Sequence, residues 1–210
     1  LYIACRYGHV DVARLLLDKG AAVDPADKVG ATPLHAACEK GHVDAARLLL
    51  EKGVEVDRAD KGGATPLFIA CQKGHVDVAR LLLENGAEVD LASEKGATPL
   101  FIACYKGHVD AARLMLDKGA EVDRADKLGR TPLDAAKHFH HEAVVALLEE
   151  HYTAKFPLYA AARTGDVEAM TQLLDGGAAV DKIALFVTCE HGHVDAVRLL
   201  LERGAEVGRG

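Results

Sequence analysis

A strict period of 33 residues constrains this chain more than any other feature. The tetrapeptide Ala-Thr-Pro-Leu begins at Ala31, Ala64 and Ala97, and Arg-Thr-Pro-Leu follows at Arg130. Four of the five cysteines keep the same spacing: Cys5, Cys38, Cys71 and Cys104. A fixed period of this length is typical of a repeat protein, in which each unit buries its apolar face against its neighbours.

The first half of each unit predicts a short helix. In the second unit, Thr32 is a suitable N-cap, and Pro33 fits the first helical position because its missing N–H would be unpaired there. Leu34, Ala37 and Cys38 then share one face of that helix. We therefore expect a helix that begins after the Thr-Pro pair and packs through this apolar stripe.

The second half of each unit predicts another helix and then a loop. Gly41 separates the two helices, and the second is expected from about His42 to Lys52. Its predicted buried residues are Val43, Ala46, Leu49 and Leu50. Residues 54–63 are polar and rich in glycine, so we expect an extended loop there.

These features together resemble the ankyrin repeat. The matching residues are Asp27-x-x-Gly30-x-Thr-Pro-Leu-His35-x-Ala, then Gly41-His42, then Leu-Leu-Leu and Gly-x-x-Val. The resemblance covers nearly the whole chain. It implies an all-α solenoid of about seven helix-turn-helix units, with β-hairpin fingers projecting at right angles. The finger position that is most often Asn in the family is Asp here: Asp24, Asp57, Asp90, Asp123 and Asp181.

The fifth unit departs from the pattern. Lys137 stands where the cysteine is expected, Glu149 replaces a leucine and Tyr152 replaces the loop glycine. Burying these charges under a further repeat would be costly, and the unit resembles a polar-faced capping repeat. We therefore predict that residues 1–152 form an array of five units.

Two further units are predicted in residues 153–210. Leu158 opens the first of them only 25 residues after Leu133, so its finger is missing and a junction lies near residues 151–157. Two repeats bury too little surface to stand alone, so these units either stack on the first array or begin a second one. Because both ends fall inside repeats, we expect the chain to be a fragment of a longer protein.

Spacing argues against metal or disulfide roles for the repeated cysteines and histidines. Equivalent residues of neighbouring units lie about one helix spacing apart, ~8–10 Å, beyond the ~7 Å limit for a disulfide and the ~2.0–2.1 Å of a Zn–His bond. The cysteines should form a buried, reduced column, which favours a reducing, cytoplasmic location. The resemblance implies that one repeated histidine is structural and bonds loop backbone between units: His9, His42, His75, His108 and His193.

Several function classes are disfavoured. The formal charge of −7 argues against a general nucleic-acid binder, and no apolar run approaches the ~20 residues of a membrane helix. The denser histidine cluster of His138, His140 and His141 points in different directions, so we predict no metal site there. No catalytic motif stands apart from the repeat. We therefore predict no catalytic residue, no cofactor and no small-molecule substrate.

In ankyrin-like proteins the variable positions of the fingers and first helices line a concave groove. This carry-over gives the candidate partner-binding residues, which are Arg6, Tyr7, Lys28, Lys40, Lys61, Lys73, Lys95, Tyr105, Lys106, Lys127 and Arg130. The set is basic although the chain is acidic, so it predicts a protein partner with an acidic segment. A lysine face kept for solubility is the alternative. Phe68 and Phe101, which replace His35, are expected to pack between helices and fingers.

The leading hypothesis is a protein–protein interaction module that binds through its finger and inner-helix groove. A structural scaffold in a larger assembly is one alternative, favoured by the near-identity of the second to fourth units. A regulatory array of a multidomain enzyme is the other. Mutation of the groove separates the first two hypotheses, because a scaffold would make its contacts elsewhere.

Overall fold

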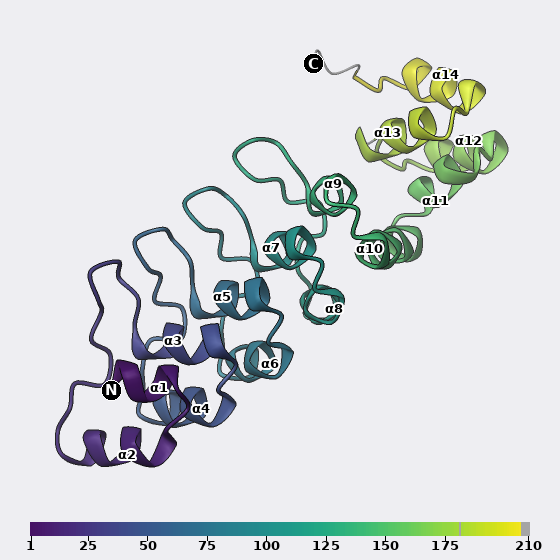
Figure 1. Ribbon diagram of the computed structural model, residues 1–210. Coiled ribbons are helices and arrows are strands. Elements are labelled where there is room, and N and C mark those ends of the chain that lie inside the picture. Colours follow the sequence, from purple (N-terminus) through teal and green to yellow (C-terminus); the bar gives the residue numbers. More distant parts are fainter. Residues whose placement is uncertain (181, 207–210) are drawn as a thin grey trace. The chain divides into compact units, whose positions relative to one another are not determined.

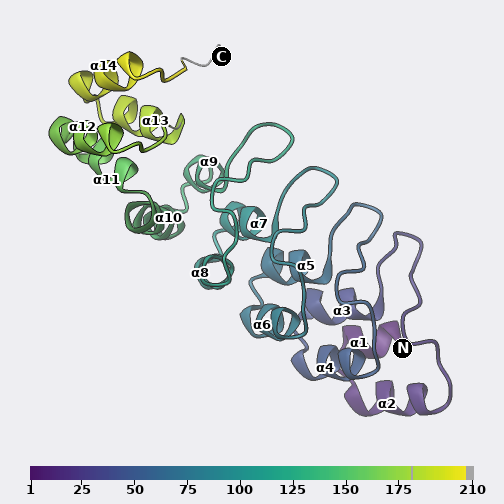
Figure 2. The ribbon, with the colours of Figure 1, turned by 180° about the vertical axis from the view of Figure 1, so that it is seen from behind.

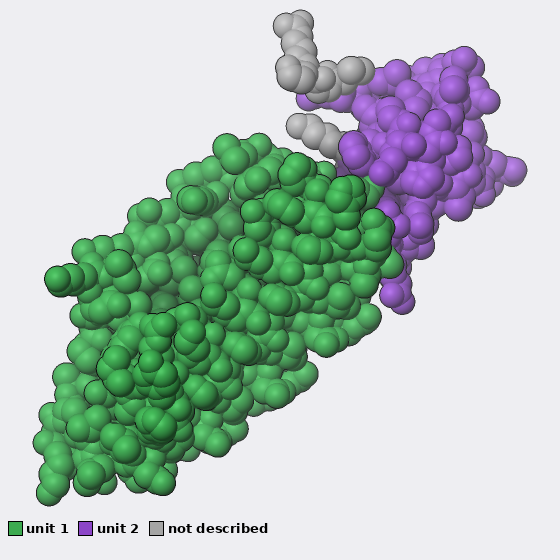
Figure 3. Space-filling model, viewed as in Figure 1, with its two compact units in different colours: residues 1–147 green, residues 148–210 purple. Residues whose placement is uncertain are grey.

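The computed structural model describes residues 1–180 and 182–206, which form fourteen helices in seven consecutive pairs and no strand (Figure 1). This confirms the all-α repeat architecture predicted from the period. The chain divides into two compact units, Leu1–Leu147 and Leu148–Gly210, shown in Figure 3. The first is called unit 1 and the second unit 2.

Unit 1 contains two rows of helices, which Figures 1 and 2 show from opposite sides. The inner row consists of α1 (Tyr2–Arg6), α3 (Pro33–Lys40), α5 (Pro66–Lys73), α7 (Pro99–Lys106) and α9 (Pro132–His138). The outer row consists of α2 (Val10–Asp18), α4 (Val43–Glu51), α6 (Val76–Glu84) and α8 (Val109–Asp117). Helix α10 (Glu142–Lys155) begins in unit 1 and continues into unit 2. Each inner helix packs against the next inner helix, and α3, α5 and α7 also pack on their own outer partners.

The Thr-Pro pairs begin the inner helices as predicted. Thr65 and Thr98 accept hydrogen bonds from the backbone N–H three residues later, each at 3.1 Å. These bonds satisfy a helix-end donor that would otherwise lack an intrahelical partner. At the other end, Gly74 adopts a left-handed conformation with φ +74° and stops α5.

The core is built mainly from small and aliphatic side chains. The repeated cysteines are buried and free, which confirms the predicted column. The prediction for the outer helices was partly wrong, because α4 buries Ala45, Ala46, Leu48 and Leu49, whereas Val43 and Leu50 are only half-buried. The outer helix packs against neighbouring outer helices as well as its inner partner. The buried face of α4 is therefore centred on different residues from those expected for a helix that packs on one side only.

Four long segments connect each outer helix of unit 1 to the next inner helix. We call residues 19–32, 52–65, 85–98 and 118–131 fingers 1 to 4. Each finger contains a tight turn. In finger 2, Asp60 N–H donates to Ala64 O at 3.0 Å and Gly63 N–H donates to Asp60 O at 3.0 Å. The hairpin turns expected from the resemblance are present, but their arms form no strand in the described residues. A single bond joins neighbouring turns, such as Lys61 N–H to Val29 O at 2.9 Å, and one bond is too few for a sheet ladder.

The repeated histidine links one unit of the array to the next. His75 Nε2 donates to Glu39 O at 3.2 Å, and His108 Nε2 donates to Gln72 O at 3.1 Å. These bonds confirm the structural role for His75 and His108, but the acceptors lie in the last turns of inner helices rather than in loop backbone. His141 makes the equivalent bond to Tyr105 O at 3.1 Å, so it belongs to this series rather than to a separate cluster. The sequence analysis missed it because His140, at φ +56°, replaces the glycine that marks the register elsewhere.

Unit 2 continues with α11 (Pro157–Thr164), α12 (Val167–Asp175), α13 (Lys182–Glu190) and α14 (Val194–Glu202). Only Phe156 separates α10 from α11, because no glycine follows to stop α10 at the predicted junction. Tyr152 and Tyr159 are buried with ring centroids 5.1 Å apart. Burial raises the pKa of Tyr159 to about 12. Asp181 of the predicted Asp series lies outside the described residues.

Candidate partner-binding surface

Two pockets lie on the finger side of unit 1, and both are lined only by fingers and inner helices. The larger, of about 370 Å³, is called the aromatic pocket; it is lined by Gly62, Ala64, Phe68, Gln72, Ser93, Glu94, Lys95, Ala97, Phe101, Ile102, Tyr105, Asp126 and Arg130. The smaller, of about 230 Å³, is called the acidic pocket; it is lined by Tyr2, Asp27, Val29, Ala31, His35, Glu39, Asp60, Ile69, Gln72 and Lys73. The surface of fingers and inner helices that the resemblance predicts for partner binding therefore contains these two pockets.

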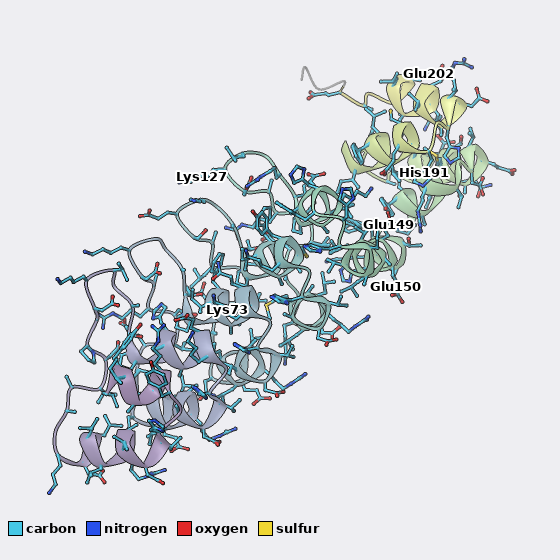
Figure 4. All side chains as sticks on the ribbon, in the orientation of Figure 1. Lys73, Lys127, Glu149, Glu150, His191 and Glu202 are labelled. Carbon is cyan, nitrogen blue, oxygen red and sulfur yellow. The ribbon has the colours of Figure 1, made fainter. Side chains whose placement is uncertain are left out.

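Some of the predicted binding residues lie together at the two pockets, whereas the others are distributed over the finger turns and the ends of the inner helices. Lys95, Tyr105 and Arg130 line the aromatic pocket, and Lys73 lines the acidic pocket. The others lie at exposed or half-exposed positions on the finger turns and at or just beyond the ends of inner helices: Lys28, Lys61 and Lys127, and Arg6, Tyr7, Lys40 and Lys106. Figure 4 labels Lys127 on finger 4 and Lys73 at the end of α5. The predicted set therefore extends along the whole row rather than forming one cluster.

Three of the predicted cations are already ion-paired. Glu39 lies 3.8 Å from Arg6 Nη1 and 3.1 Å from Lys40 Nζ. Burial raises the pKa of Glu39, but Lys40 and Arg6 outweigh it and hold that pKa below its usual value. Arg130 pairs with Asp126 through Nε at 2.9 Å and through Nη2. Burial also raises the pKa of Asp126, and the bonds from Arg130 bring it below its ordinary value.

The remaining lysines of the set have no such partner. Within the part of the chain that the structure describes, no carboxylate oxygen lies within ion-pair distance of Lys28, Lys61, Lys73, Lys95, Lys106 or Lys127. Several acids on the same side are occupied instead by finger turns. Asp60 Oδ1, for example, accepts from Gly62 N–H at 2.8 Å and Ala64 N–H at 2.9 Å. These backbone bonds fix the position of the carboxylate but leave its charge in place, so such acids still offset part of the positive charge on the finger side.

Aromatic side chains form the floor of the larger pocket. Phe68 and Phe101 are 7% and 3% exposed, which confirms that they pack between helices and fingers. Tyr105 stacks on Phe101 with centroids 6.4 Å apart, and the Arg130 guanidinium lies 5.7 Å from the Phe101 centroid. Phe139 meets the Tyr105 ring edge-on at 4.4 Å. Tyr105 is thus held in place by neighbours on both sides, which makes it a rigid contact surface.

His35 occupies in α3 the position of these phenylalanines and lines the acidic pocket. Its Nε2 donates to Ala64 O at 3.0 Å, and its Nδ1 lies 2.9 Å from Thr32 Oγ1. Burial lowers the pKa of His35 despite the bond to Ala64 and the charge of Asp60. A different departure, not recognised from the sequence, is Ser93, which stands where the three other finger turns carry Asp27, Asp60 and Asp126. The missing aspartate in this series is the sequence feature that could have identified finger 3 as different from the other fingers.

In the described residues, no three His, Cys, Asp or Glu side chains converge as metal ligands would, and no helix is long and apolar enough to cross a membrane. Burial raises the pKa of the Cys5 thiol to about 11 and that of the Cys104 thiol to about 12, whereas Cys189 is exposed. The buried thiols are therefore poor nucleophiles and poor ligands at neutral pH.

Comparison with known proteins supplies the family. No curated protein matches the chain. The family model described as ankyrin repeats (3 copies) matches residues 1–93, 86–156 and 135–209. Repeats of this kind generally mediate protein–protein interactions and typically have no enzymatic activity. Because these matches span nearly all of the sequence, the chain belongs to the ankyrin repeat family.

Proposed function

We propose that this protein binds a partner protein through the finger side of unit 1, and that the partner presents an acidic segment. The observation that carries this proposal is the row of exposed lysines without ion pairs on the fingers and inner helices. An unpaired row of one sign attracts a segment of opposite charge and speeds its association. The aromatic pocket on the same side offers a place for an apolar side chain of the partner beside its acidic residues.

We also propose that the protein acts in a reducing, cytoplasmic environment. All five cysteines are free, and the exposed Cys189 would be open to oxidation elsewhere. Neither a nucleic acid nor a small-molecule substrate is part of the proposal, since the net charge of −7 disfavours a nucleic acid and repeats of this family generally bind proteins.

Reversing the charge of inner-helix lysines tests the proposal. The variant Lys40→Glu/Lys73→Glu/Lys106→Glu changes three exposed positions at equivalent places on α3, α5 and α7. A partner captured from native extract by the wild-type chain is identified, purified and titrated against both proteins. We expect at least a tenfold loss of affinity in the variant, and wild-type affinity that falls as salt rises because exposed charges are screened.

The matched control carries the same charge change on the outer helices: Arg47→Glu/Arg80→Glu/Arg113→Glu, all exposed. It should bind nearly as well as the wild type. Loss of binding in both triple variants would show that the change in net charge, and not the position of the lysines, weakens binding. Equal binding by the lysine variant and the wild type would refute the proposed surface and favour the scaffold hypothesis, with contacts on the outer helices or the ends.

A further inference from the structure

Finger 3 lacks a carboxylate that the other fingers use to close their turns. In finger 2, Asp60 Oδ1 accepts two backbone N–H groups, at 2.8 and 2.9 Å. Asp27 does the same in finger 1 at 2.9 Å for both bonds, and Asp126 in finger 4 at 2.9 and 3.0 Å. Finger 3 has Ser93 at this position, and its hydroxyl is one bond closer to the backbone than a carboxylate oxygen.

The turn of finger 3 nevertheless keeps the shape of the others. Ser93 N–H donates to Ala97 O at 2.9 Å and Gly96 N–H donates to Ser93 O at 2.8 Å, as the equivalent groups do in finger 2. Lys95 N–H and Ala97 N–H therefore converge as their counterparts do. Neither has an acceptor within the described residues. Two convergent donors without an acceptor form a binding site for an anionic oxygen.

These two donors border the aromatic pocket. Ser93, Lys95 and Ala97 all line it, and the Phe101 and Tyr105 rings form its apolar floor. Arg130 lines the same pocket where the other fingers have Ala31, Ala64 and Ala97. The pocket thus combines unsatisfied N–H groups and cations with an aromatic surface.

The charged groups that line the pocket are balanced in number, with two cations and two acids. Lys95 is exposed and has no ion pair in the part of the chain described. Of the two acids that line the pocket, Asp126 is committed to Arg130 and to its own turn, and Glu94 is exposed. Glu94 and Lys95 are both exposed, so solvent screens both charges alike, and the two N–H groups without an acceptor are what favours an anionic oxygen here.

From this geometry we infer that finger 3 is a carboxylate-binding site for the partner. An Asp or Glu side chain of the partner accepts hydrogen bonds from Lys95 N–H and Ala97 N–H, as Asp60 does within finger 2. An apolar residue beside it in the partner sequence packs on Phe101 and Tyr105. The inference rests on the proposed function, because it assumes that an acidic segment lies along the finger side. Beyond that function, it specifies where one carboxylate of the partner binds and that an apolar residue of the partner lies beside it.

Amide resonances provide a direct test. The full chain, labelled with ¹⁵N, is titrated with a capped peptide Leu-Phe-Glu-Leu and with the uncharged control Leu-Phe-Gln-Leu. We expect the Lys95 and Ala97 amide protons to move downfield with the glutamate peptide and to respond much less to the glutamine peptide, because hydrogen bonds to a carboxylate are the stronger ones.

Two substitutions at one position complete the test. Ser93→Asp supplies the carboxylate internally, so both amides should already be shifted downfield in the free protein. The apparent affinity for the glutamate peptide should then fall roughly tenfold or more. Ser93→Ala removes the hydroxyl without supplying an acceptor and should keep the response.

The outcomes separate this inference from the proposed function. If the glutamate peptide shifts resonances of the lysine row but moves these two amides no more than the glutamine peptide does, the carboxylate site is refuted and the proposed surface stands. If Ser93→Asp binds the peptide as well as Ser93→Ala does, the carboxylate site is also refuted. The proposed surface itself is judged separately by the partner titration with the lysine variant.

Discussion

Replacing Gly74 with Ala tests how neighbouring repeats are held together. Gly74 is left-handed at φ +74°, and a Cβ added to it would lie 2.7 Å from Nδ1 and 2.9 Å from Cγ of His108. The His108 ring is also fixed by its Nε2 bond to Gln72 O at 3.1 Å. The ring therefore has to move or weaken that bond to accept one methyl group.

The expected loss of stability has two parts. A left-handed alanine costs about 1–2 kcal/mol for its backbone conformation alone. Displacing the ring adds about 0.5–1.5 kcal/mol for the hydrogen bond and about 0.5–1.5 kcal/mol if the side chain leaves its rotamer. The free energy of unfolding should therefore fall by about 2–5 kcal/mol, summing these ranges.

Gly53→Ala is the matched control within unit 1. Gly53 has φ +80°, yet nothing lies within 4 Å of an added Cβ. It should cost only the backbone part, about 1–2 kcal/mol. The difference between the two variants, about 1–3 kcal/mol, measures the contact with His108.

Equilibrium urea unfolding followed by far-ultraviolet circular dichroism measures both losses, with the m-value as a check on cooperativity. A double-mutant cycle with His108→Ala then isolates the contact, since the added methyl group meets no ring in that background. Equal losses for Gly74→Ala and Gly53→Ala, together with no coupling to His108, would show that the histidine contact does not hold the repeats.

Three further predictions concern caps, thiols and a buried acid. Thr98→Ala removes the side-chain acceptor of Phe101 N–H and should destabilise the chain by about 1 kcal/mol in the same unfolding assay. In the native protein a thiol reagent should modify Cys189 rapidly and the four buried cysteines only after unfolding, which mass spectrometry of the labelled chain can check. Burial raises the pKa of Asp57 despite its bond from Glu88 N–H, so ionised Asp57 opposes folding and stability falls as pH rises through its folded pKa. Asp57→Asn should therefore stabilise the protein at neutral pH, by a margin that shrinks at acid pH; a gain of the same size at both would contradict the assignment.

Local chemistry explains which parts of the fold could be predicted. A Thr-Pro pair at the start of a helix acts through bonds within one turn, so Thr98 identifies the start of α7 without knowledge of the rest. The end of α10 has no such signal, because Tyr152 replaces a glycine and only packing determines where the helix stops. The His141 contact was missed for a related reason: His140 replaces the glycine that marks the register of the other histidines, so no local signal placed His141 in their series.

The candidate site was predictable in position but not in charge. The repeat register placed Lys95, Tyr105 and Arg130 on the finger side, and all three line one pocket. It did not reveal that Glu39 lies near both Arg6 and Lys40, because the contact with Arg6 joins different units and both contacts depend on side-chain rotamers. Ion pairs of this kind require three-dimensional positions, which a linear pattern does not contain.

The repeat itself identifies where this array differs from a uniform spacer. Ser93 interrupts a series of finger aspartates, and Arg130 interrupts a series of finger alanines. These two changes are 37 residues apart in the sequence, yet both line the aromatic pocket, beside Tyr105. Neither is needed for the fold, since the other fingers close their turns with Asp and Ala at these places. Ser93 even gives up two hydrogen bonds that its neighbours make. A scaffold would gain nothing from that loss, whereas a partner that supplies the missing carboxylate would recover both bonds.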